Sequence, residues 1–233
     1  MIFCMTTSLI RACSILALLL VLWSAAFARN GVWRDELGLW EDTVSKSTSN
    51  SRALGSLGRA CASAGQIDRA RALFNRAVEA GVQNPLAYNN RGNFLYNTGE
   101  PEQALDDYTR AIALDPLYAA AYYNRGIAHA ALKRYNSAYE DYVTAVRLDP
   151  LNSRAFMNLA NLFDETGQPD KALESYARAI ELDPIAADIY YNRGLAYAKM
   201  GRSEQAVADL RKACDLGSMI ACRSLSGGAS PVK

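Results

Sequence analysis

The chain offers few residues that could do chemistry, and its single histidine is the first to weigh. His129 could act as a general base only beside a nucleophile and an orienting acid, because a catalytic imidazole works within such a constellation. The sequence contains no serine, histidine and acid set, no glycine-rich phosphate loop and no cluster with metal-ligand spacing. It therefore argues against an enzyme, and it predicts no cofactor and no metal.

His129 has a different explanation in a repeat that runs through most of the chain. Five stretches share one pattern with a period of 34 residues, without an insertion, from Ser51 to Ile220. Such a fixed period indicates a stack of structural units. His129 occupies place 11 of its unit, where the other units have packing residues, so we expect a core histidine. These counterparts are Cys61, Leu95, Phe163 and Tyr197.

Small and large apolar residues at fixed places predict two antiparallel helices in each unit. In the unit 85–118, Gly92 is expected to let the two helix backbones approach closely, while Tyr108 fills the space beside it. Gly99 suits a left-handed turn between the helices, and Pro101 suits the first turn of the second helix. Pro116 then ends that helix. Neither helix is long enough to be stable alone, so neighbouring units must stack.

At these places the sequence resembles the tetratricopeptide repeat family, with an aromatic at place 4, glycine at 8, alanine at 20 and 27, an aromatic at 24 and proline at 32. The resemblance implies an all-α, right-handed superhelical solenoid. We expect an N-terminal half-repeat at 29–50 that leads into the first repeat, and a C-terminal cap and tail at 221–233. The five expected repeats are 51–84, 85–118, 119–152, 153–186 and 187–220.

The segment before the repeats predicts contact with a membrane. Residues 12–28 are apolar and uncharged, Arg11 precedes them, and Ala26 and Ala28 suit cleavage of a secretory signal peptide before Arg29. The alternative is a hydrophobic helix within 1–28 that remains as a single transmembrane anchor. Either interpretation places the repeats outside the cytoplasm, which is the periplasm if the protein is bacterial.

Residues 29–52 resemble the junction between the last membrane helix and the first repeat in multi-pass, O-mannosyltransferase-like membrane proteins that end in tetratricopeptide repeats. The resemblance implies that this chain could be a detached tail. The carboxylates assigned to catalysis in that family lie in an early loop with no counterpart here, so the tail would transfer no sugar. The residues that carry the resemblance are Arg29, Asn30, Trp33, Leu39, Trp40 and Arg52.

Arginine at place 7 occurs together with aspartate at place 23. Both are present in repeats two, three and five, and both are absent from repeats one and four. The pattern predicts an arginine–aspartate contact that sets the register, either within a unit or across adjacent units. Chance among five repeats is the alternative. The predicted pairs are Arg91–Asp107, Arg125–Asp141 and Arg193–Asp209.

Two cysteines near the C-terminus resemble the pair that staples consecutive helices in Sel1-like repeats. That resemblance implies a disulfide between Cys214 and Cys222, which an environment outside the cytoplasm permits. The alternative is two small buried thiols. Cys61 would remain free in the core.

The first helix of each unit lines the concave side in this family, and place 6 of that helix is asparagine in four repeats. An amide both donates and accepts, so it can bind the backbone of an extended peptide. This row resembles the asparagine ladder in the repeat domain of O-GlcNAc transferase. The alternative is asparagine tolerated on a solvated face. The predicted groove residues are Asn90, Asn124, Asn158 and Asn192, then Asn93 and Asn161, with Tyr96, Tyr123, Met157 and Tyr191 for apolar contact.

The predicted partner is therefore a protein or an extended peptide. The 25 basic and 24 acidic residues form no basic stripe that could neutralise phosphates, which excludes nucleic acid. No small-molecule substrate is expected.

The sequence predicts a non-catalytic protein-interaction scaffold outside the cytoplasm. One alternative is an accessory tail that presents polypeptide to a membrane glycosyltransferase. The other is a cytoplasmic co-chaperone-like adaptor, although place 5 lacks the lysine that clamps a terminal carboxylate.

Overall fold

The computed structural model describes residues 36–226, which form twelve α-helices and no strand. The expected leader at 1–28, residues 29–35 of the expected half-repeat and the tail after 226 lie outside the described residues. No helix among the residues described is long and apolar enough to cross a membrane.

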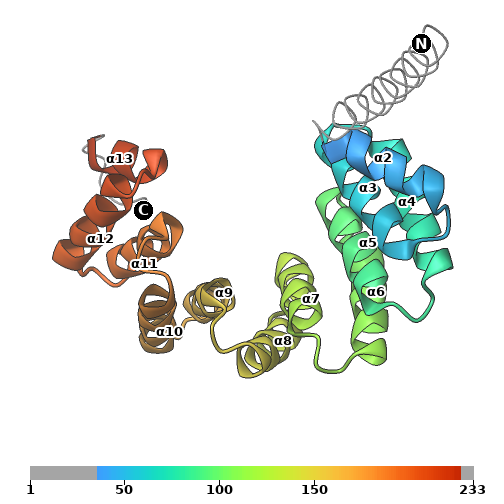
Figure 1. The fold of residues 1–233 in the computed structure, drawn as a ribbon. Helices are drawn as coiled ribbons and strands as arrows, with labels where there is room; N and C mark the ends of the chain where they lie inside the picture. The colour runs from blue at the N-terminus through green and yellow to red at the C-terminus, as the bar shows by residue number, and fades with distance from the viewer. Residues whose placement is uncertain (1–35, 227–233) are drawn as a thin grey trace, which may run out of the picture. The chain divides into compact units, whose positions relative to one another are not determined.

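Ten of these helices, between Ser51 and Asp215, form pairs whose bounds fall inside the five expected repeats (Figure 1), whereas the last helix begins at Met219, two residues before the expected C-terminal cap. The chain divides into two compact units, residues 1–82 and 83–233. The described helices of the first unit are α2 (Glu36–Lys46), α3 (Ser51–Ser63) and α4 (Ile67–Ala80). Those of the second unit are α5 (Pro85–Asn97), α6 (Pro101–Leu114), α7 (Ala119–Ala131), α8 (Tyr135–Leu148), α9 (Ser153–Glu165), α10 (Pro169–Leu182), α11 (Ala187–Lys199), α12 (Ser203–Asp215) and α13 (Met219–Ser226).

In the first unit, α2 packs on α3, as the predicted half-repeat requires. Val44 is buried, and Glu41 accepts a hydrogen bond from the Arg69 guanidinium of α4 at 2.6 Å. Cys61 is buried on α3 as a free thiol, and burial raises the pKa of that thiol.

The turn inside each repeat is left-handed at place 15. Gly99 has φ 86°, and glycine takes a similar angle in three other repeats. The next residue donates its backbone N–H to the carbonyl five residues back, as Glu100 does to Leu95 at 2.9 Å, which closes the end of the first helix. In the third repeat Lys133 occupies this place with φ 57°, a conformation that costs a residue with a β-carbon.

Glycine at place 8 lies directly against the aromatic ring at place 24, as the expected packing of Tyr108 beside Gly92 requires. A β-carbon built on Gly92 would lie 2.7 Å from the ring of Tyr108, and one built on Gly126 would lie 2.7 Å from the ring of Tyr142. These glycines make room for the aromatic side chain of the second helix. Only Gly194, whose repeat has Leu210 in place of the aromatic, faces the backbone oxygen of the partner helix among its nearest atoms, at 3.3 Å.

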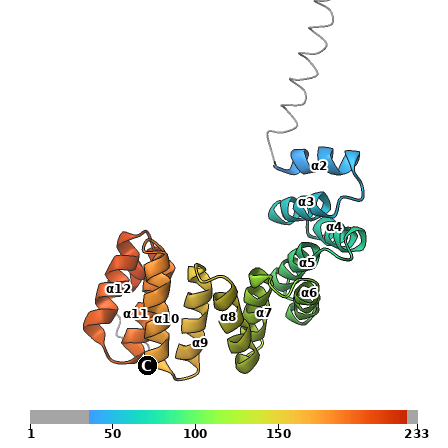
Figure 2. The ribbon, with the colours of Figure 1, turned by 60° about the horizontal axis from the view of Figure 1, so that its bottom comes forward.

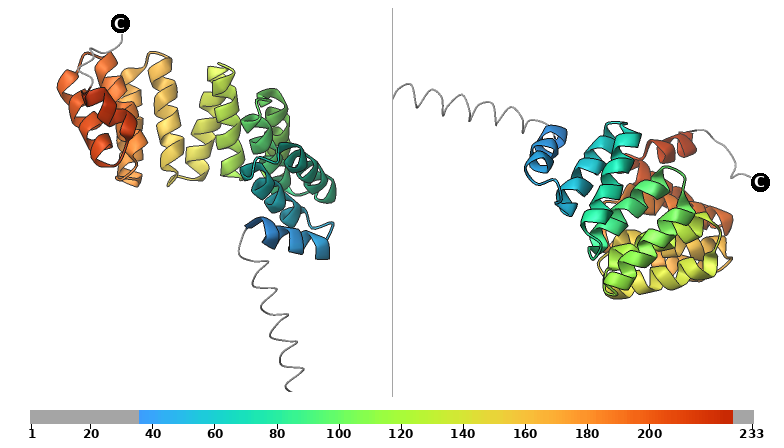
Figure 3. Two further views of the ribbon diagram at one scale, coloured as in Figure 1. Left: turned by 90° about the horizontal axis from the view of Figure 1, so that it is seen from above. Right: turned by 90° about the vertical axis from the view of Figure 1, so that its right-hand side faces the viewer.

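Within the second unit the pairs stack in a row, with α9, α10, α11 and α12 side by side (Figures 2 and 3). The first helices also contact one another, α5 with α7, α7 with α9 and α9 with α11. They lie on the inner side of a curved arrangement in which α8 and α10 are outermost (Figure 1). One face therefore brings together residues that are 34 positions apart in the sequence.

At the C-terminal end of the row, α13 packs on α12. Cys214 and Cys222 are joined by a disulfide that links these two helices. Ala213 and Ala221 are buried beside it, together with Tyr190. The structure thus has the bond that the resemblance implies, rather than two free thiols.

Candidate functional site

The two helices of a repeat are held in register by arginine–aspartate pairs at the base of the inner face. Arg125 Nε and Nη2 donate to Asp141 Oδ2 and Oδ1 at 2.9 and 2.8 Å. The corresponding distances are 2.8 and 2.7 Å for Arg91 with Asp107, and 2.7 and 2.8 Å for Arg193 with Asp209. All three contacts lie within one repeat, so the alternative of a contact across adjacent repeats is not the one that the structure forms.

These pairs are buried on the aspartate side and flanked by aromatic rings. The three aspartates are buried, and the hydrogen bonds to them raise the pKa of the Arg125 and Arg193 guanidinium groups. Arg125 lies 5.7 Å from the centre of the Tyr122 ring, where its charge faces the ring's electrons. Bidentate geometry of this kind fixes orientation as well as distance, so the first helix of each such repeat presents a defined face.

The predicted asparagines lie half-buried along that face. Asn124 Nδ2 donates to Asn89 Oδ1 of the preceding repeat at 3.0 Å, and Asn158 Nδ2 donates to the Tyr123 hydroxyl at 3.2 Å. Each of these amides keeps its carbonyl oxygen and one N–H for other contacts. Within the part of the chain that the structure describes, the side chains of Asn90 and Asn192 have no hydrogen-bond partner.

One helical turn further on, place 9 forms a second polar row. The Tyr108 hydroxyl donates to Asn93 Oδ1 at 2.8 Å, and the Tyr176 hydroxyl donates to Asn161 Oδ1. Both phenols are buried, and burial raises their pKa. The second helix thereby fixes the orientation of both amides, a role that the sequence alone did not assign.

The third repeat interrupts the second row. It has Ile127 at place 9, and Tyr142 at place 24 has no hydrogen-bond partner among the described residues. Tyr142 is only 3% exposed. Its hydroxyl opens into a hollow of about 270 Å³, whose lining residues come from three successive repeats. They are Tyr96, Ile127, Ala130, Ala131, Tyr142, Asn158, Asn161, Leu162 and Glu165.

A second hollow of about 240 Å³ adjoins the first and shares Tyr96 and Ile127 with it. It is lined by Asn93, Tyr96, Asn97, Tyr108, Asn124 and Ile127. Five of the predicted groove residues therefore line these two hollows. Tyr123 lines neither, but its hydroxyl accepts a hydrogen bond from Asn158, which lines the first. The two hollows together form a continuous site over α5, α7 and α9.

Five predicted groove residues lie outside both hollows, namely Asn90, Asn192, Tyr123, Met157 and Tyr191. Met157 packs against the buried cluster that contains Tyr176 and Ile189. Tyr191 packs against the cluster around Tyr190. Met157 and Tyr191 thus contribute to the core as well as to the inner face.

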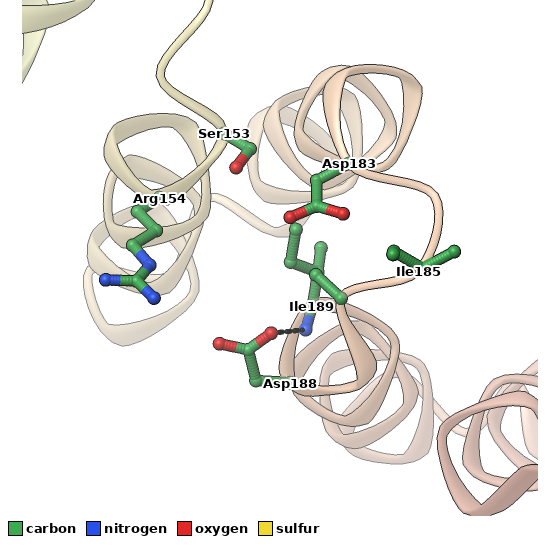
Figure 4. Close-up of a pocket in the computed structure, with 7 residues that line it drawn as sticks. Ser153, Arg154, Asp183, Ile185, Asp188 and Ile189 are labelled. Carbon is green, nitrogen blue, oxygen red and sulfur yellow. Dashed lines mark hydrogen bonds between the residues drawn. The ribbon is translucent and has the colours of Figure 1, made fainter. Parts of the chain in front are cut away.

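A third hollow of about 310 Å³ lies one turn nearer the N-terminal ends of the inner helices. Figure 4 shows its side chains coming from the starts of α9 and α11 and from the turn between α10 and α11. Arg154, Asp183 and Asp188 give it mixed charge, and Ile185 is exposed at its edge. It contains none of the predicted groove residues.

His129 lies beside the Arg125–Asp141 pair of the third repeat. Its side chain is 17% exposed, and its Nε2 lies 4.0 Å from Asp141 Oδ2. Its Nδ1 is buried with no hydrogen-bond partner in the described part of the chain. Burial, with Arg125 and Arg134 nearby, lowers the pKa of this imidazole although Asp141 opposes the shift. The geometry agrees with a packing histidine.

A row of helix pairs with one polar inner face is the architecture of an α-helical repeat protein. The chain belongs to the tetratricopeptide repeat family. Models of that repeat match residues 85–118, 119–152 and 187–216, and related ones match residues 26–85, 142–174 and 161–201, so the matches span 26–216 without a gap. Proteins of this family are generally non-catalytic scaffolds, which agrees with the expectation that the chain is not an enzyme.

Solved structures with this fold resemble the chain over most of its length. MamA is 26% identical, with a TM-score of 0.62 over 71% of this chain and 97% of its own. YrrB, described as a tetratricopeptide repeat protein with an unusual peptide-binding site, is 23% identical, with a TM-score of 0.60 over 80% of this chain and 97% of its own. PilF of Pseudomonas aeruginosa is 22% identical, with a TM-score of 0.67 over 73% of this chain and 78% of its own. No curated protein matches the chain in sequence.

Proposed function

We propose that the chain is a protein-interaction scaffold that binds an extended polypeptide along the inner face of α5, α7 and α9. The observation that carries the proposal is the row of half-buried asparagines beside two adjoining hollows on one continuous face. The amides of Asn124 and Asn158 are held in place by the preceding repeat, and each retains a free oxygen and a free N–H. Such groups suit the alternating donors and acceptors of a peptide backbone.

The likeness to YrrB supports the same proposal, because that protein is described as having a peptide-binding site on this fold. Backbone-directed amides give affinity with little sequence selectivity, so selectivity must come from side-chain hollows beside them. The two hollows beside Asn124 and Asn158 can accept such side chains.

The test is selection of a displayed library of random 12-residue peptides on the full chain, followed by fluorescence anisotropy with the selected peptides. Replacing Asn124 and Asn158 together by alanine should weaken binding by about tenfold or more, because two polar contacts are lost. Asn136→Ala is the matched control, since Asn136 is exposed on the second helix α8. Equal binding by the double variant and the control would overturn the proposal.

We also propose that the repeats lie outside the cytoplasm. The apolar, uncharged residues 12–28 and the disulfide between Cys214 and Cys222 support this location. The non-reduced mass of the native protein tests it. A product beginning at Arg29, or an intact membrane-bound product, with the disulfide formed agrees with export. A soluble product that retains Met1 and has reduced cysteines would contradict it and favour the cytoplasmic adaptor.

The accessory-tail alternative rests on the resemblance of residues 29–52 to the junction of O-mannosyltransferase-like proteins. In that arrangement the inner face would present the acceptor polypeptide to a separate enzyme. A native product much larger than this chain, with further membrane helices before Met1, would support the alternative. A product that starts at Met1 or at Arg29 would count against it.

A further inference from the structure

We propose that the hollow of the third repeat takes a lysine or arginine side chain of the bound peptide. We call this hollow the Tyr142 socket and define it by Tyr96, Ile127, Tyr142, Leu162 and Glu165. The inference rests on the proposed peptide binding and adds the chemistry that the groove selects.

The first argument is a hydrogen bond that the socket lacks. In repeats two and four the buried place-24 tyrosine donates to the asparagine at place 9. In repeat three Ile127 has replaced that asparagine, so the Tyr142 hydroxyl has no partner among the described residues. Among the described residues His129 Nδ1 is the buried polar atom without a partner, so the Tyr142 hydroxyl is open to the hollow, and a ligand group that enters the socket can hydrogen-bond to it in place of water. An ammonium or guanidinium group can donate to the hydroxyl oxygen.

The second argument is charge. Glu165 is the one charged residue that lines the Tyr142 socket, and no charged residue lines the adjoining hollow. No hydrogen bond or ion pair to another described side chain occupies the Glu165 carboxylate. The nearby Lys199 is held by Asp164 at 2.6 Å, so it does not neutralise the socket. Burial raises the pKa of Tyr142 and Glu165 adds to the rise, so the phenol stays neutral beside a negative charge.

The third argument is the shape of the walls. Ala130 and Ala131 stand where the second repeat has Tyr96 and Asn97 and the fourth has Asp164 and Glu165, so the small residues of α7 create the space. Ile127 and Leu162 offer apolar surface to the carbon stem of a long basic side chain, whose charged end can then reach polar groups. The Tyr96 ring adds a face that attracts a cation. An acidic side chain would be repelled by Glu165, and a purely apolar one would displace water from the Tyr142 hydroxyl without replacing its hydrogen bond.

The experiment repeats the 12-residue library selection on the full-length wild type and on Glu165→Gln and Tyr142→Phe. Phenylalanine is the residue of the first repeat at this place, Phe74, so the second variant is expected to fold. Glu174→Gln is the matched charge control, because Glu174 is exposed on α10 outside the socket. A thermal melt of each variant checks its folding.

We expect lysine or arginine to be enriched at one position among the peptides selected by the wild type and by Glu174→Gln. A selected lysine peptide should lose about threefold to fivefold in affinity for Glu165→Gln and for Tyr142→Phe, as an exposed ion pair and a single hydrogen bond predict. The same peptide with norleucine in place of lysine should bind the wild type and both variants equally.

The experiment distinguishes failure of the peptide-binding proposal from failure of the inference that the Tyr142 socket takes a basic side chain. If no peptide is retained by the wild type, peptide binding itself is wrong, and the inference falls with it. If peptides are retained without a preference for lysine or arginine, or if that preference persists unchanged in both variants, peptide binding is supported but the inference about the socket is overturned. Enrichment of acidic or purely apolar residues at that position would also overturn it.

Discussion

Arg193 and Asp209 face each other across the last repeat, with Nε and Nη2 of the arginine 2.7 and 2.8 Å from the two carboxylate oxygens. Because Asp209 is buried, its charge depends on the arginine for compensation. The first repeat has Leu57 and Leu73 at the same two places, which shows that an apolar pair also suits this position.

Replacing only one residue of this pair should therefore lower the free energy of unfolding, whereas replacing both by apolar residues should change it little. Arg193→Leu is expected to lower the free energy of unfolding by about 3–5 kcal/mol, because it leaves a buried carboxylate unpaired. The double variant Arg193→Leu, Asp209→Leu should recover most of that loss. Urea unfolding of the two single variants, the double variant and the wild type measures the coupling. Additive effects of the two substitutions would contradict the prediction.

Lys133 should be replaceable by glycine with a gain in stability. Its φ of 57° lies in the left-handed region, where glycine occurs in the other four repeats and where a β-carbon costs about 1 kcal/mol. Lys133→Gly is expected to raise the free energy of unfolding by roughly 0.5–1 kcal/mol, and Gly99→Ala to lower it by a similar amount. Thermal melts of both variants check the two signs. A destabilised Lys133→Gly would show that the lysine side chain contributes more than its backbone strain costs.

Stability should fall as the pH drops below the ordinary pKa of histidine. Burial lowers the pKa of His129 below its usual 6.5 in the folded state, so the unfolded chain binds the proton more readily. The loss of stability caused by His129 is absent well above pH 6.5, and it grows as the pH falls from there toward the folded-state pKa.

His129→Leu is the matched variant, since Leu95 occupies the same place in the second repeat. We expect the wild type to lose more stability than His129→Leu between pH 7 and pH 5, because only the wild type has an imidazole that the unfolded chain protonates more readily. Urea unfolding at both pH values measures the difference. Parallel loss in the two proteins would show that His129 does not titrate abnormally.

Reduction of the disulfide should release α13 selectively. The bond between Cys214 and Cys222 spans 8 positions of sequence, and closing a loop of that size stabilises a chain by about 2–3 kcal/mol. Hydrogen exchange of residues 219–226 is expected to accelerate in Cys222→Ser, while exchange in α5 to α9 stays unchanged. Cys61→Ser is not a suitable control because Cys61 is buried in the core. Ser224→Ala serves instead, because Ser224 is exposed on α13. Equal exchange of residues 219–226 in Cys222→Ser and Ser224→Ala would contradict the prediction.

The helix pairs were predictable because the same residue types recur at the same places. Gly99, Pro101 and Pro116 mark turns that any chain with those residues would favour, and the helices begin and end there. The arginine–aspartate contacts could also be predicted, since the two residues occur together or not at all. The packing of Tyr108 beside Gly92 was expected as well, but the sequence could not say that the ring lies so close that a β-carbon on Gly92 would be 2.7 Å from it.

Five of the thirteen residues that line the two hollows were among the predicted groove residues. Asn93, Tyr96, Asn124, Asn158 and Asn161 line the two hollows as expected. The remaining lining residues were missed, although one signal was present in the sequence. Ile127 interrupts a row that has asparagine on either side, and such a break marks the place where the buried tyrosine behind it loses its partner.

The sequence by itself determined the repeat, its helices and the contacts inside each unit, because these depend on residues close together in the chain and on a period that repeats five times. Only the tertiary structure decided how neighbouring units share their side chains. Asn124 bonds to Asn89, whereas the Tyr142 hydroxyl is left open to a hollow between three repeats. These outcomes depend on the rotation from one unit to the next, which side-chain packing sets and which the period alone does not fix.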